Sequence, residues 1–418
     1  MRKKLLTLSK SNALTFKVDT TKAGISDSYS FRIPTIGGGY NYTVDWGDGF
    51  VNTGVTGNIT HTYSTQGIKI IKITGVFPLF YFANSGDKLK LLNIINWGNI
   101  TYSTVQNYAF WGCTNLTSIA YGEWLNTITN GDAMFYACAS LTTLPNSITF
   151  ASLTNGSQMF QDCTSLTTLP NSITFASLNI AESMFQNCTS LTTLPNSITF
   201  ASLTNGSYMF SYSSITNIPS SITFASLTNG YYMFQVCTSL TTLPSSITFA
   251  NVTNGFAMFA GSSITNIPSS ITFANVTNGS YMFQNCTSLT TLPNSITFAS
   301  LTNGYYMFQY CTLLTTLPSS ITFANVTNGE SMFQYCTLLT TLPNSITFAS
   351  LTNGVAMFSS IINKSNYSQL LINIASYNTN NNVTFNGGGS KYNTAGQTAR
   401  NQLTGVQGWV ITDGGYEP

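Results

Sequence analysis

The sequence contains few charged residues: Asp, Glu, Lys and Arg make up 6% of its 418 residues, against about 25% in an ordinary soluble domain. From Met134 to Met357 the charged side chains are Asp162, Glu182 and Glu330, and all fourteen Lys and Arg lie outside this stretch. Proteins hold nucleic acid mainly through clustered Lys and Arg. With a formal net charge of +2 and no basic cluster, the sequence predicts no nucleic-acid partner.

Histidine and long apolar runs are also lacking. His61 is the single histidine, which excludes Ser-His-Asp and Cys-His catalysis in the repeated part of the chain. No stretch approaches the roughly 20 apolar residues of a membrane span. The apolar run after the basic start is broken at residues 9–12, whereas a secretory signal needs roughly 7 to 15 apolar residues. We therefore expect a chain that is not an enzyme and has no cofactor, no membrane insertion and no signal peptide.

A repeat of about 25 residues fills more than half of the chain. The pair Met-Phe recurs in steps of 25, with two steps of 24 that end at Met233 and Met282. A degraded copy at Ala109-Phe110 brings the number of copies to eleven. The Met residues of the full copies are Met134, Met159, Met184, Met209, Met233, Met258, Met282, Met307, Met332 and Met357. Such a period is typical of solenoids, in which each copy stacks on its neighbours.

One copy cannot fold alone. Its eight apolar side chains contribute about 16 kcal/mol on burial, at roughly 2 kcal/mol each, whereas ordering its backbone costs about 25 kcal/mol or more. In the copy from Met282 we expect a short strand at "TTL" that ends at Pro293, and a second extended piece at "SITF". We expect left-handed Asn and Gly at the "TNG" corner, 302–304, and one helical or 3₁₀ turn at "SYMFQNC", 280–286.

The repeats resemble the BspA-like branch of the leucine-rich repeats. The segment "NVTNGSYMFQNCTSLTTLP", residues 275–293, carries the "NVTN" and "MF..C..L..L" elements of that branch in the same order. The resemblance covers residues 109–357. It implies a right-handed leucine-rich-repeat-like solenoid in a cell-surface or adhesive setting, and it implies no catalytic residues.

The region before the repeats resembles a different module. "YNYTVDWGDG" (40–49) and "THTYSTQGIKIIKITG" (60–75) are similar to the polycystic-kidney-disease-type (PKD-like) β-sandwich. We expect a mainly β protein with an N-terminal arm (1–12), a PKD-like sandwich (13–78), an N-terminal cap (79–108), the solenoid (109–357) and a C-terminal cap (358–418). In the last of these we expect helices near 367–376 and 394–403 and strands at 383–385 and 409–412. The tail also resembles the terminal segment of many BspA-like proteins.

The cysteines and acidic residues have structural explanations. All eight Cys occupy one repeat position, four residues after the Met, and none forms the C-x-x-C pair of a metal site. We expect a buried column of thiols and no metal. Asp45 and Asp48 in "DWGDG" offer too few oxygen ligands for a hard cation, so we expect them to stabilise a turn, and His61 to pack or cap a turn beside them.

Comparison of the copies with one another identifies a candidate binding face. The two residues before each Met-Phe vary most, and the third residue after the Met also varies. Tyr among Ser, Asn and Gln is typical of binding surfaces, because Tyr gives a large contact area at a low entropy cost. The predicted ligand-binding residues are Tyr208, Tyr212, Tyr231, Tyr232, Tyr281, Tyr305, Tyr306, Tyr310 and Tyr335. The alternative is drift at unconstrained solvent positions.

These observations favour a non-enzymatic adhesion or recognition protein. We expect a bacteriophage virion fibre or receptor-binding component that contacts a glycan or protein on the host surface. It would be a homo-oligomer or be attached to a larger particle through its N-terminal domain. The alternatives are a bacterial cell-surface adhesin, a structural filament subunit, and an array that orders water through its Thr columns, such as Thr290 and Thr291.

Overall fold

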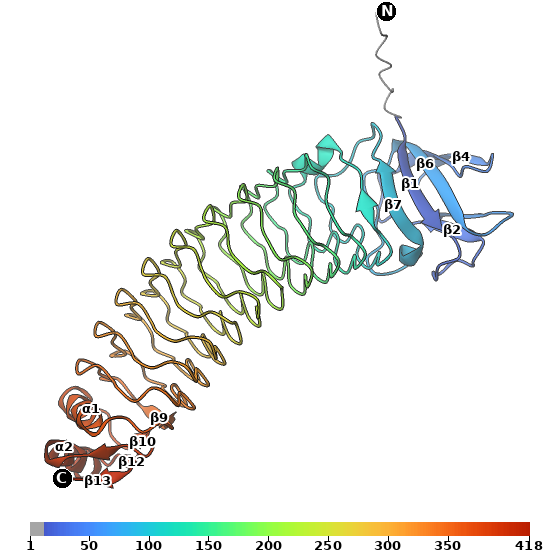
Figure 1. Cartoon of the computed structure of the whole chain (residues 1–418). Coiled ribbons are helices and arrows are strands. Elements are labelled where there is room, and N and C mark those ends of the chain that lie inside the picture. Colours follow the sequence, from blue (N-terminus) through green and yellow to red (C-terminus); the bar gives the residue numbers. More distant parts are fainter. Residues whose placement is uncertain (1–11) are drawn as a thin grey trace, which may run out of the picture. The chain divides into compact units, whose positions relative to one another are not determined.

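The computed structural model describes residues 12–418, so the expected N-terminal arm, 1–12, lies almost entirely outside the described residues. The chain divides into two compact units. Unit 1 comprises Met1–Ser177 and Asn187–Leu191, and unit 2 comprises Leu178–Gln186 and Thr192–Pro418. Each unit contains irregular coils of about 25 residues, and the regular strands and helices lie before or after these coils (Figure 1).

Unit 1 begins with two β-sheets. A six-stranded sheet has the order β4-β3-β6-β1-β7-β8, and β2 pairs with β5 in a two-stranded sheet. Phe16 on β1 contacts Phe31 on β2 with ring centroids 6.0 Å apart, so the two sheets share a buried aromatic core. The regular elements are β1 (Leu14–Asp19), β2 (Ser30–Ile33), β3 (Asn41–Asp45), β4 (Val51–Val55), β5 (Ile59–Thr62), β6 (Ile68–Val76), η1 (Lys88–Lys90), β7 (Leu91–Asn96), β8 (Ser118–Ile119) and η2 (Glu123–Thr127).

The larger sheet continues past residue 78, where we expected the sandwich to end and a cap to begin. β7 pairs antiparallel with β1, with Phe16 opposite Ile94, and β8 extends the sheet by parallel pairing with β7. The proposed cap therefore shares a sheet with the module before it. A sequence pattern cannot reveal this pairing, because strand order depends on contacts between residues about 80 positions apart.

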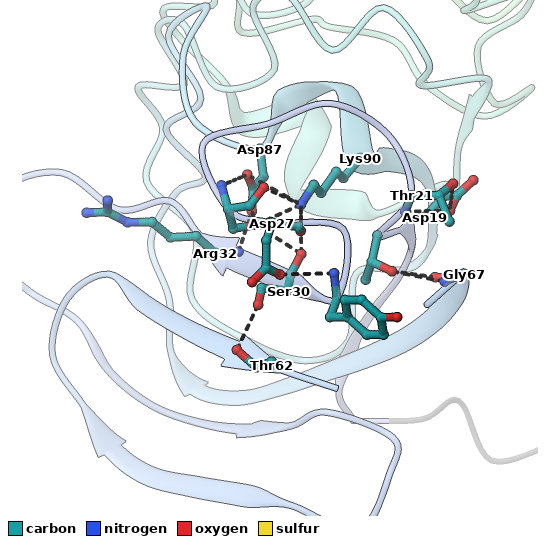
Figure 2. A network of polar contacts seen from close by, with 12 residues as sticks. Asp19, Thr21, Asp27, Ser30, Arg32, Thr62, Gly67, Asp87 and Lys90 are labelled. Atoms are coloured by element: carbon teal, nitrogen blue, oxygen red, sulfur yellow. Dashed lines mark hydrogen bonds and ion pairs between the residues drawn. The ribbon is translucent and has the colours of Figure 1, made fainter. Parts of the chain in front are cut away.

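A buried lysine joins the same two segments (Figure 2). The Lys90 side chain is fully buried and its ammonium donates to the carbonyl oxygens of Ser26, Asp27 and Ser30 at 3.0, 2.6 and 2.8 Å. Asp87 lies 3.9 Å away and accepts from the backbone N–H groups of Ser26 and Arg32. Burial lowers the pKa of Lys90, and the carboxylates of Asp87 and Asp27 oppose this shift. The loop between β1 and β2 is thus fixed onto η1.

The turns predicted for the acidic pair are confirmed. Asp45 Oδ1 accepts from the N–H of Gly47 at 2.9 Å, and Asp48 Oδ1 accepts from the N–H of Phe50 at 3.2 Å. The imidazole of His61 stacks on the Trp46 indole and its Nε2 lies 2.8 Å from Asp48 Oδ2. The expectation that His61 packs and caps this turn is therefore also confirmed.

The coils are joined by peptide groups that point along the stack. In unit 2 the N–H of Tyr281 donates to the carbonyl of Tyr305 in the next coil at 2.8 Å. The carbonyl of Ser280, in the same peptide group, accepts from Ala257 in the preceding coil at 2.9 Å. The pattern repeats two residues further along and also occurs in unit 1, where Ala133 donates to Ser157. Each coil therefore satisfies its backbone through its neighbours, as the stacking argument requires.

The predicted helical turn at "SYMFQNC" is wrong. This segment is a series of turns in which Met282, Gln284 and Cys286 donate to carbonyls three residues earlier. The residues between them donate to the next coil, which a helix cannot do because its N–H groups all point along its own axis. The alternation places left-handed residues at fixed positions, with φ +59° at Tyr281 and +57° at Asn285.

The left-handed angles predicted for "TNG" are also wrong. None of its Asn or Gly residues, such as Asn303 and Gly304, has a positive φ among the described residues. Asn303 Oδ1 instead accepts from the N–H of Tyr305 at 3.2 Å, an Asx turn that forms the corner. The glycine packs closely against the next coil: a Cβ on Gly279 would lie 2.8 Å from Leu301 Cδ1 and 3.4 Å from Met307 Cε. The coil of Met184 carries the buried Ala181 at the equivalent position.

The expected turn after the proline is confirmed. Ile296 donates to the carbonyl of Pro293 at 3.0 Å, and the equivalent bond recurs in other coils of both units. The "TTL" strand is shorter than expected, since it forms isolated bridges such as Asn266 to Thr291 instead of a regular strand. Thr290 Oγ1 donates to the carbonyl of Thr265 in the preceding coil.

Inside each unit, like side chains form buried columns. Met282 and Met307 are fully buried, as the stacking model predicts. Phe283 and Phe308 stack with centroids 5.3 Å apart and planes 7° from parallel. All eight cysteines are buried and free, and burial raises the pKa of the Cys286 thiol to about 12. The buried thiol column is therefore confirmed.

Unit 2 ends in a mixed segment whose elements follow the sequence prediction closely. β9 continues the stack by parallel pairing with β10, which pairs with β12 on its other side. Among the helices of residues 12–418, none combines the length and apolarity needed to cross a bilayer. The elements are β9 (Asn353–Phe358), α1 (Lys364–Tyr377), β10 (Thr384–Gly387), β11 (Lys391–Tyr392), α2 (Thr394–Gly405), β12 (Val410–Thr412) and β13 (Gly415–Tyr416). The right-handed twist, the count of eleven coils and the domain limits stay predictions.

Replacement of the buried lysine tests its role in unit 1. Lys90→Met removes the cation that balances the buried Asp87 carboxylate and the ammonium that donates to three carbonyls, so we expect a loss of about 3–5 kcal/mol in the free energy of unfolding. Chemical denaturation followed by Trp fluorescence measures it. The exposed Lys22→Met is the control and should change little. Equal stability of the two variants would contradict the assigned role.

Replacement of a corner glycine tests the packing between coils. Gly279→Ala brings a methyl group against the buried Leu301, and we expect a loss of about 1–3 kcal/mol from overpacking. Gly405→Ala in α2 has open space around its Cβ and should be neutral or slightly stabilising. Thermal unfolding by circular dichroism compares the two. If Gly279→Ala matches its control, the glycine column is not a packing requirement.

Candidate functional site

Most of the predicted tyrosines meet in one continuous row of rings in unit 2. We call this set the aromatic row; it occupies the two positions before Met-Phe in five successive coils. Neighbouring rings lie with centroids 4.2 to 5.3 Å apart, alternating between stacked and edge-on contacts. Its members are Tyr208, Tyr231, Tyr232, Phe256, Tyr281, Tyr305 and Tyr306, and all of them are half-buried.

Phe256 is a member that the sequence reasoning missed. Its ring stacks on Tyr231 at 5.1 Å and contacts Tyr281 at 5.3 Å, so it connects the tyrosines of the coils on either side. The signal was available, since Phe256 lies at the same repeat position as Tyr231 and Tyr305. It was overlooked because the prediction was restricted to hydroxyl-bearing rings.

The remaining predicted residues lie outside the row. Tyr310 and Tyr335, at the third position after the Met, stack on each other at 4.5 Å with exposed fractions of 40% and 42%. We call these two the tyrosine pair. Tyr212 holds the same repeat position and is 47% exposed, but the coils between it and the pair carry Val236, Gly261 and Asn285 there. The predicted face is therefore divided between two repeat positions.

The backbone does not require tyrosine at these places. Four tyrosines, Tyr208, Tyr232, Tyr281 and Tyr306, have φ from +54° to +59°, and the equivalent residues of other coils, such as Ala133, have a similar left-handed angle. Gly and Asn adopt this conformation at the least cost, and a bulky side chain is disfavoured there. Tyrosine at four of these positions is thus not explained by local conformation.

Acidic side chains flank the aromatic row, at the repeat position two residues before the Met. Glu182 precedes Tyr208 by one coil and Glu330 follows Tyr305 by one coil. These two are the only glutamates between Met134 and Met357, and no Lys or Arg lies in that stretch. Asn353 donates to Glu330 Oε2 at 3.0 Å, whereas Glu182 is exposed. An anionic ligand would meet only repulsion along the row.

Burial and neighbouring hydroxyls raise the pKa of three tyrosines of the row, Tyr208, Tyr232 and Tyr305. Burial, together with the side-chain hydrogen bond to Tyr231, raises the pKa of Tyr208 to about 12. Hydrogen bonding to Tyr306 is the main cause of the raised pKa of Tyr305, followed by burial. The row therefore offers neutral hydroxyl groups and ring edges near neutral pH. Within residues 12–418 no three His, Cys, Asp or Glu side chains gather as they would around a metal ion.

Two known families match the chain. Residues 80–205 and 156–290 match the BspA type leucine-rich repeat region, in six copies, and together span half of the chain. Residues 265–373 match the family described as Mycoplasma protein of unknown function, DUF285. No curated protein is similar enough to be counted as a relative. The matches bear out the resemblance of the repeats, and the PKD-like module at 13–78 stays a prediction because it precedes residue 80.

Ionisation of the row can be followed by its tyrosinate absorbance. The folded state favours the protonated, neutral form of Tyr208, because the pKa of this side chain is raised from 10 to about 12. The resulting stabilisation of the fold is therefore complete below pH 10 and disappears as the pH rises through about 12. The difference between titration curves of the native chain and Tyr208→Phe should centre near pH 12. A difference curve centred near pH 10, as for an ordinary tyrosine, would contradict the packing of the row.

Proposed function

Because the chain belongs to the BspA-type leucine-rich repeat family, a family of surface proteins, we propose that it is a non-enzymatic recognition protein that binds a surface molecule through the aromatic row. The observation that carries the proposal is the unbroken contact of seven rings over five coils, four of these rings being tyrosines at left-handed positions where the backbone favours smaller residues. A row of side chains that drifted without constraint would not be expected to stay in ring contact from coil to coil.

The charge of the surrounding coils limits which charge the ligand can carry. Glu182 and Glu330 flank the row and no cation lies between Met134 and Met357, so the ligand is neutral or carries a positive charge. Tyrosine hydroxyls and ring edges beside Ser and Asn side chains suit the hydroxyl groups and apolar faces of a neutral glycan, or a polar protein loop. Acidic polysaccharides and phosphorylated surfaces are excluded as partners of the row.

The tyrosine pair, Tyr310 and Tyr335, belongs to the proposed surface as a secondary contact. Both rings are more exposed than those of the row. The backbone of both residues is left-handed, with φ +62°, and other coils carry Asn187, Gly261 or Asn285 at this repeat position. Tyr212 shares the position without a partner tyrosine in the next coil. We propose that Tyr212 contributes least.

The carrier that we propose is a bacteriophage virion, with the chain as a fibre or receptor-binding component. The alternative is a bacterial cell surface, and residues 265–373 match a bacterial family, described as Mycoplasma protein of unknown function. The two differ in where the chain is found: in purified virions, or on intact cells where external protease removes it. Polymers formed by the isolated chain would instead support the filament subunit.

Substitution by asparagine separates binding from folding. Tyr306→Asn and Tyr310→Asn place a residue that favours left-handed angles at φ +57° and +62°, so we expect the melting temperature to be unchanged or higher. Adhesion of the double variant to the surface that the wild-type chain recognises, measured by whole-cell binding, should fall at least about tenfold, since interface tyrosines are frequent hot spots.

The control is Gln158→Asn, at the same repeat position and φ +54° in a coil whose residue is half-buried and lies outside the row. It should keep both stability and adhesion. If the double variant adheres as well as the wild-type chain, the tyrosines are surface drift and the proposed binding face is wrong. If it unfolds instead, their role is structural.

A further inference from the structure

A separate cavity lies in unit 1, outside the repeats that carry the aromatic row. It has a volume of ≈410 Å³ and lies between the end of β7, the loop that follows it and the start of η2. Known ligand pockets occupy roughly 300–1,000 Å³. The side chains that matter for its chemistry are Trp97, Asn99, Tyr102, Tyr121, Glu123 and Trp124.

The wall of this cavity is a fixed aromatic cluster. Tyr102 stacks on Trp124 with centroids 4.1 Å apart and planes 20° from parallel, and Trp97 meets Trp124 edge-on at 4.9 Å. The indole N–H of Trp97 donates to the carbonyl of Ala120 at 2.7 Å, and the Tyr102 hydroxyl donates to the carbonyl of Trp97. These hydrogen bonds hold the rings in place without a ligand. Binding would therefore cost little conformational entropy in the side chains of the wall.

Two glycines are required for this arrangement. A Cβ on Gly122 would lie 2.7 Å from Trp97 Cδ1 and 2.9 Å from Trp124 Cδ1, so only glycine lets the backbone pass this close to the indoles. Gly98 has φ +68°, and its Cβ would meet the backbone of Ala13 and Leu14 at 2.4 Å. Both lie beside the aromatic residues in the sequence, at the two segments that form the cavity.

Polar groups stand at the rim. Glu123 and Asn99 are exposed, and Tyr121 is 38% exposed. Glu123 takes part in none of the ion pairs formed by residues 12–418, so its carboxylate is available to accept hydrogen bonds. The cavity lining contains no Lys or Arg. The described residues of the lining therefore offer no counter-charge to a phosphate or carboxylate ligand.

We propose that this cavity binds one ring of a neutral carbohydrate. The apolar C–H face of a sugar ring packs on an aromatic side chain, and its hydroxyl groups donate to a carboxylate and exchange hydrogen bonds with an amide. A quaternary ammonium group also binds aromatic side chains, but it needs several ring faces directed at one point. Here Tyr102 and Trp124 each cover one face of the other, so this pair leaves at most one face of each ring for a ligand. One face is enough for a sugar ring, whereas it does not form a cage for a quaternary ammonium group.

The test uses the full chain and ligand-observed saturation-transfer NMR. The probes are the methyl glycosides of glucose, galactose, mannose and N-acetylglucosamine, with choline chloride and sialic acid as cationic and anionic comparisons. We expect saturation of the ring C–H protons of at least one neutral glycoside and none of sialic acid. Binding of choline alone, or of no neutral glycoside, overturns the proposal.

Variants assign the signal to the cavity. Glu123→Gln preserves the size and shape of this exposed side chain and removes its charge. The affinity for the glycoside should fall about tenfold, which is the loss expected for one charge-assisted hydrogen bond. Trp124→Ala should abolish binding, and because it can also perturb folding, its thermal unfolding is measured beside it. Loss of binding in Trp124→Ala together with unchanged binding in Glu123→Gln would show that the carboxylate has no part and overturn the assignment.

A matched control keeps this site distinct from the rest of unit 1. Lys22→Met replaces an exposed residue outside the cavity lining and should bind the glycoside as the wild-type chain does. If Glu123→Gln and Trp124→Ala retain the glycoside while the double variant Tyr306→Asn and Tyr310→Asn in unit 2 loses it, the sugar binds the row and the cavity proposal fails. The inference does not depend on the function proposed for the row.

Discussion

The structure depends on peptide groups that point along the direction in which coils stack. In the Met-Phe segment every second peptide accepts from the coil before and donates to the coil after, as the group between Ser280 and Tyr281 does. The peptides between them close turns within their own coil. Because a single coil leaves half of these groups unpaired, neither the hydrogen bonds nor the buried columns can form without neighbours.

This arrangement determines which positions can vary. Left-handed residues such as Tyr281 and Asn285 are among those whose N–H groups donate to the next coil, and they lie in the sequence on either side of the buried Met and Phe. Side chains as different as Ala257, Ser331 and Tyr306 occupy the same position with φ between +50° and +57°. Variation there leaves the core unchanged, so a binding surface can be altered coil by coil without loss of the fold. The aromatic row is one such surface, and its limits coincide with the glutamates of the flanking coils.

The candidate site was predictable in part. Comparison of the copies identified the positions before Met-Phe as variable and named Tyr208, Tyr281 and Tyr305 there, and their role as a binding face stays a prediction. It could not show that Tyr310 and Tyr335 lie apart from these, because the direction of each side chain follows from the turn conformation, which was mistaken for a helical turn. The cavity beside Trp124 was not foreseen either. Its walls come from β7 and η2, and their meeting depends on the pairing of β7 with β1.

The sequence by itself determined the period, the identity of the buried columns, the turn after each proline and the elements of the C-terminal segment. These features are local or repeat at a fixed spacing, so hydrophobic burial and proline geometry specify them without knowledge of distant contacts. Tertiary structure alone decided where the left-handed residues lie, how closely the corner glycines pack and which strands complete the N-terminal sheet. Each of these depends on how closely another part of the chain approaches: the next coil for Gly279, and a strand about 80 residues away for β1.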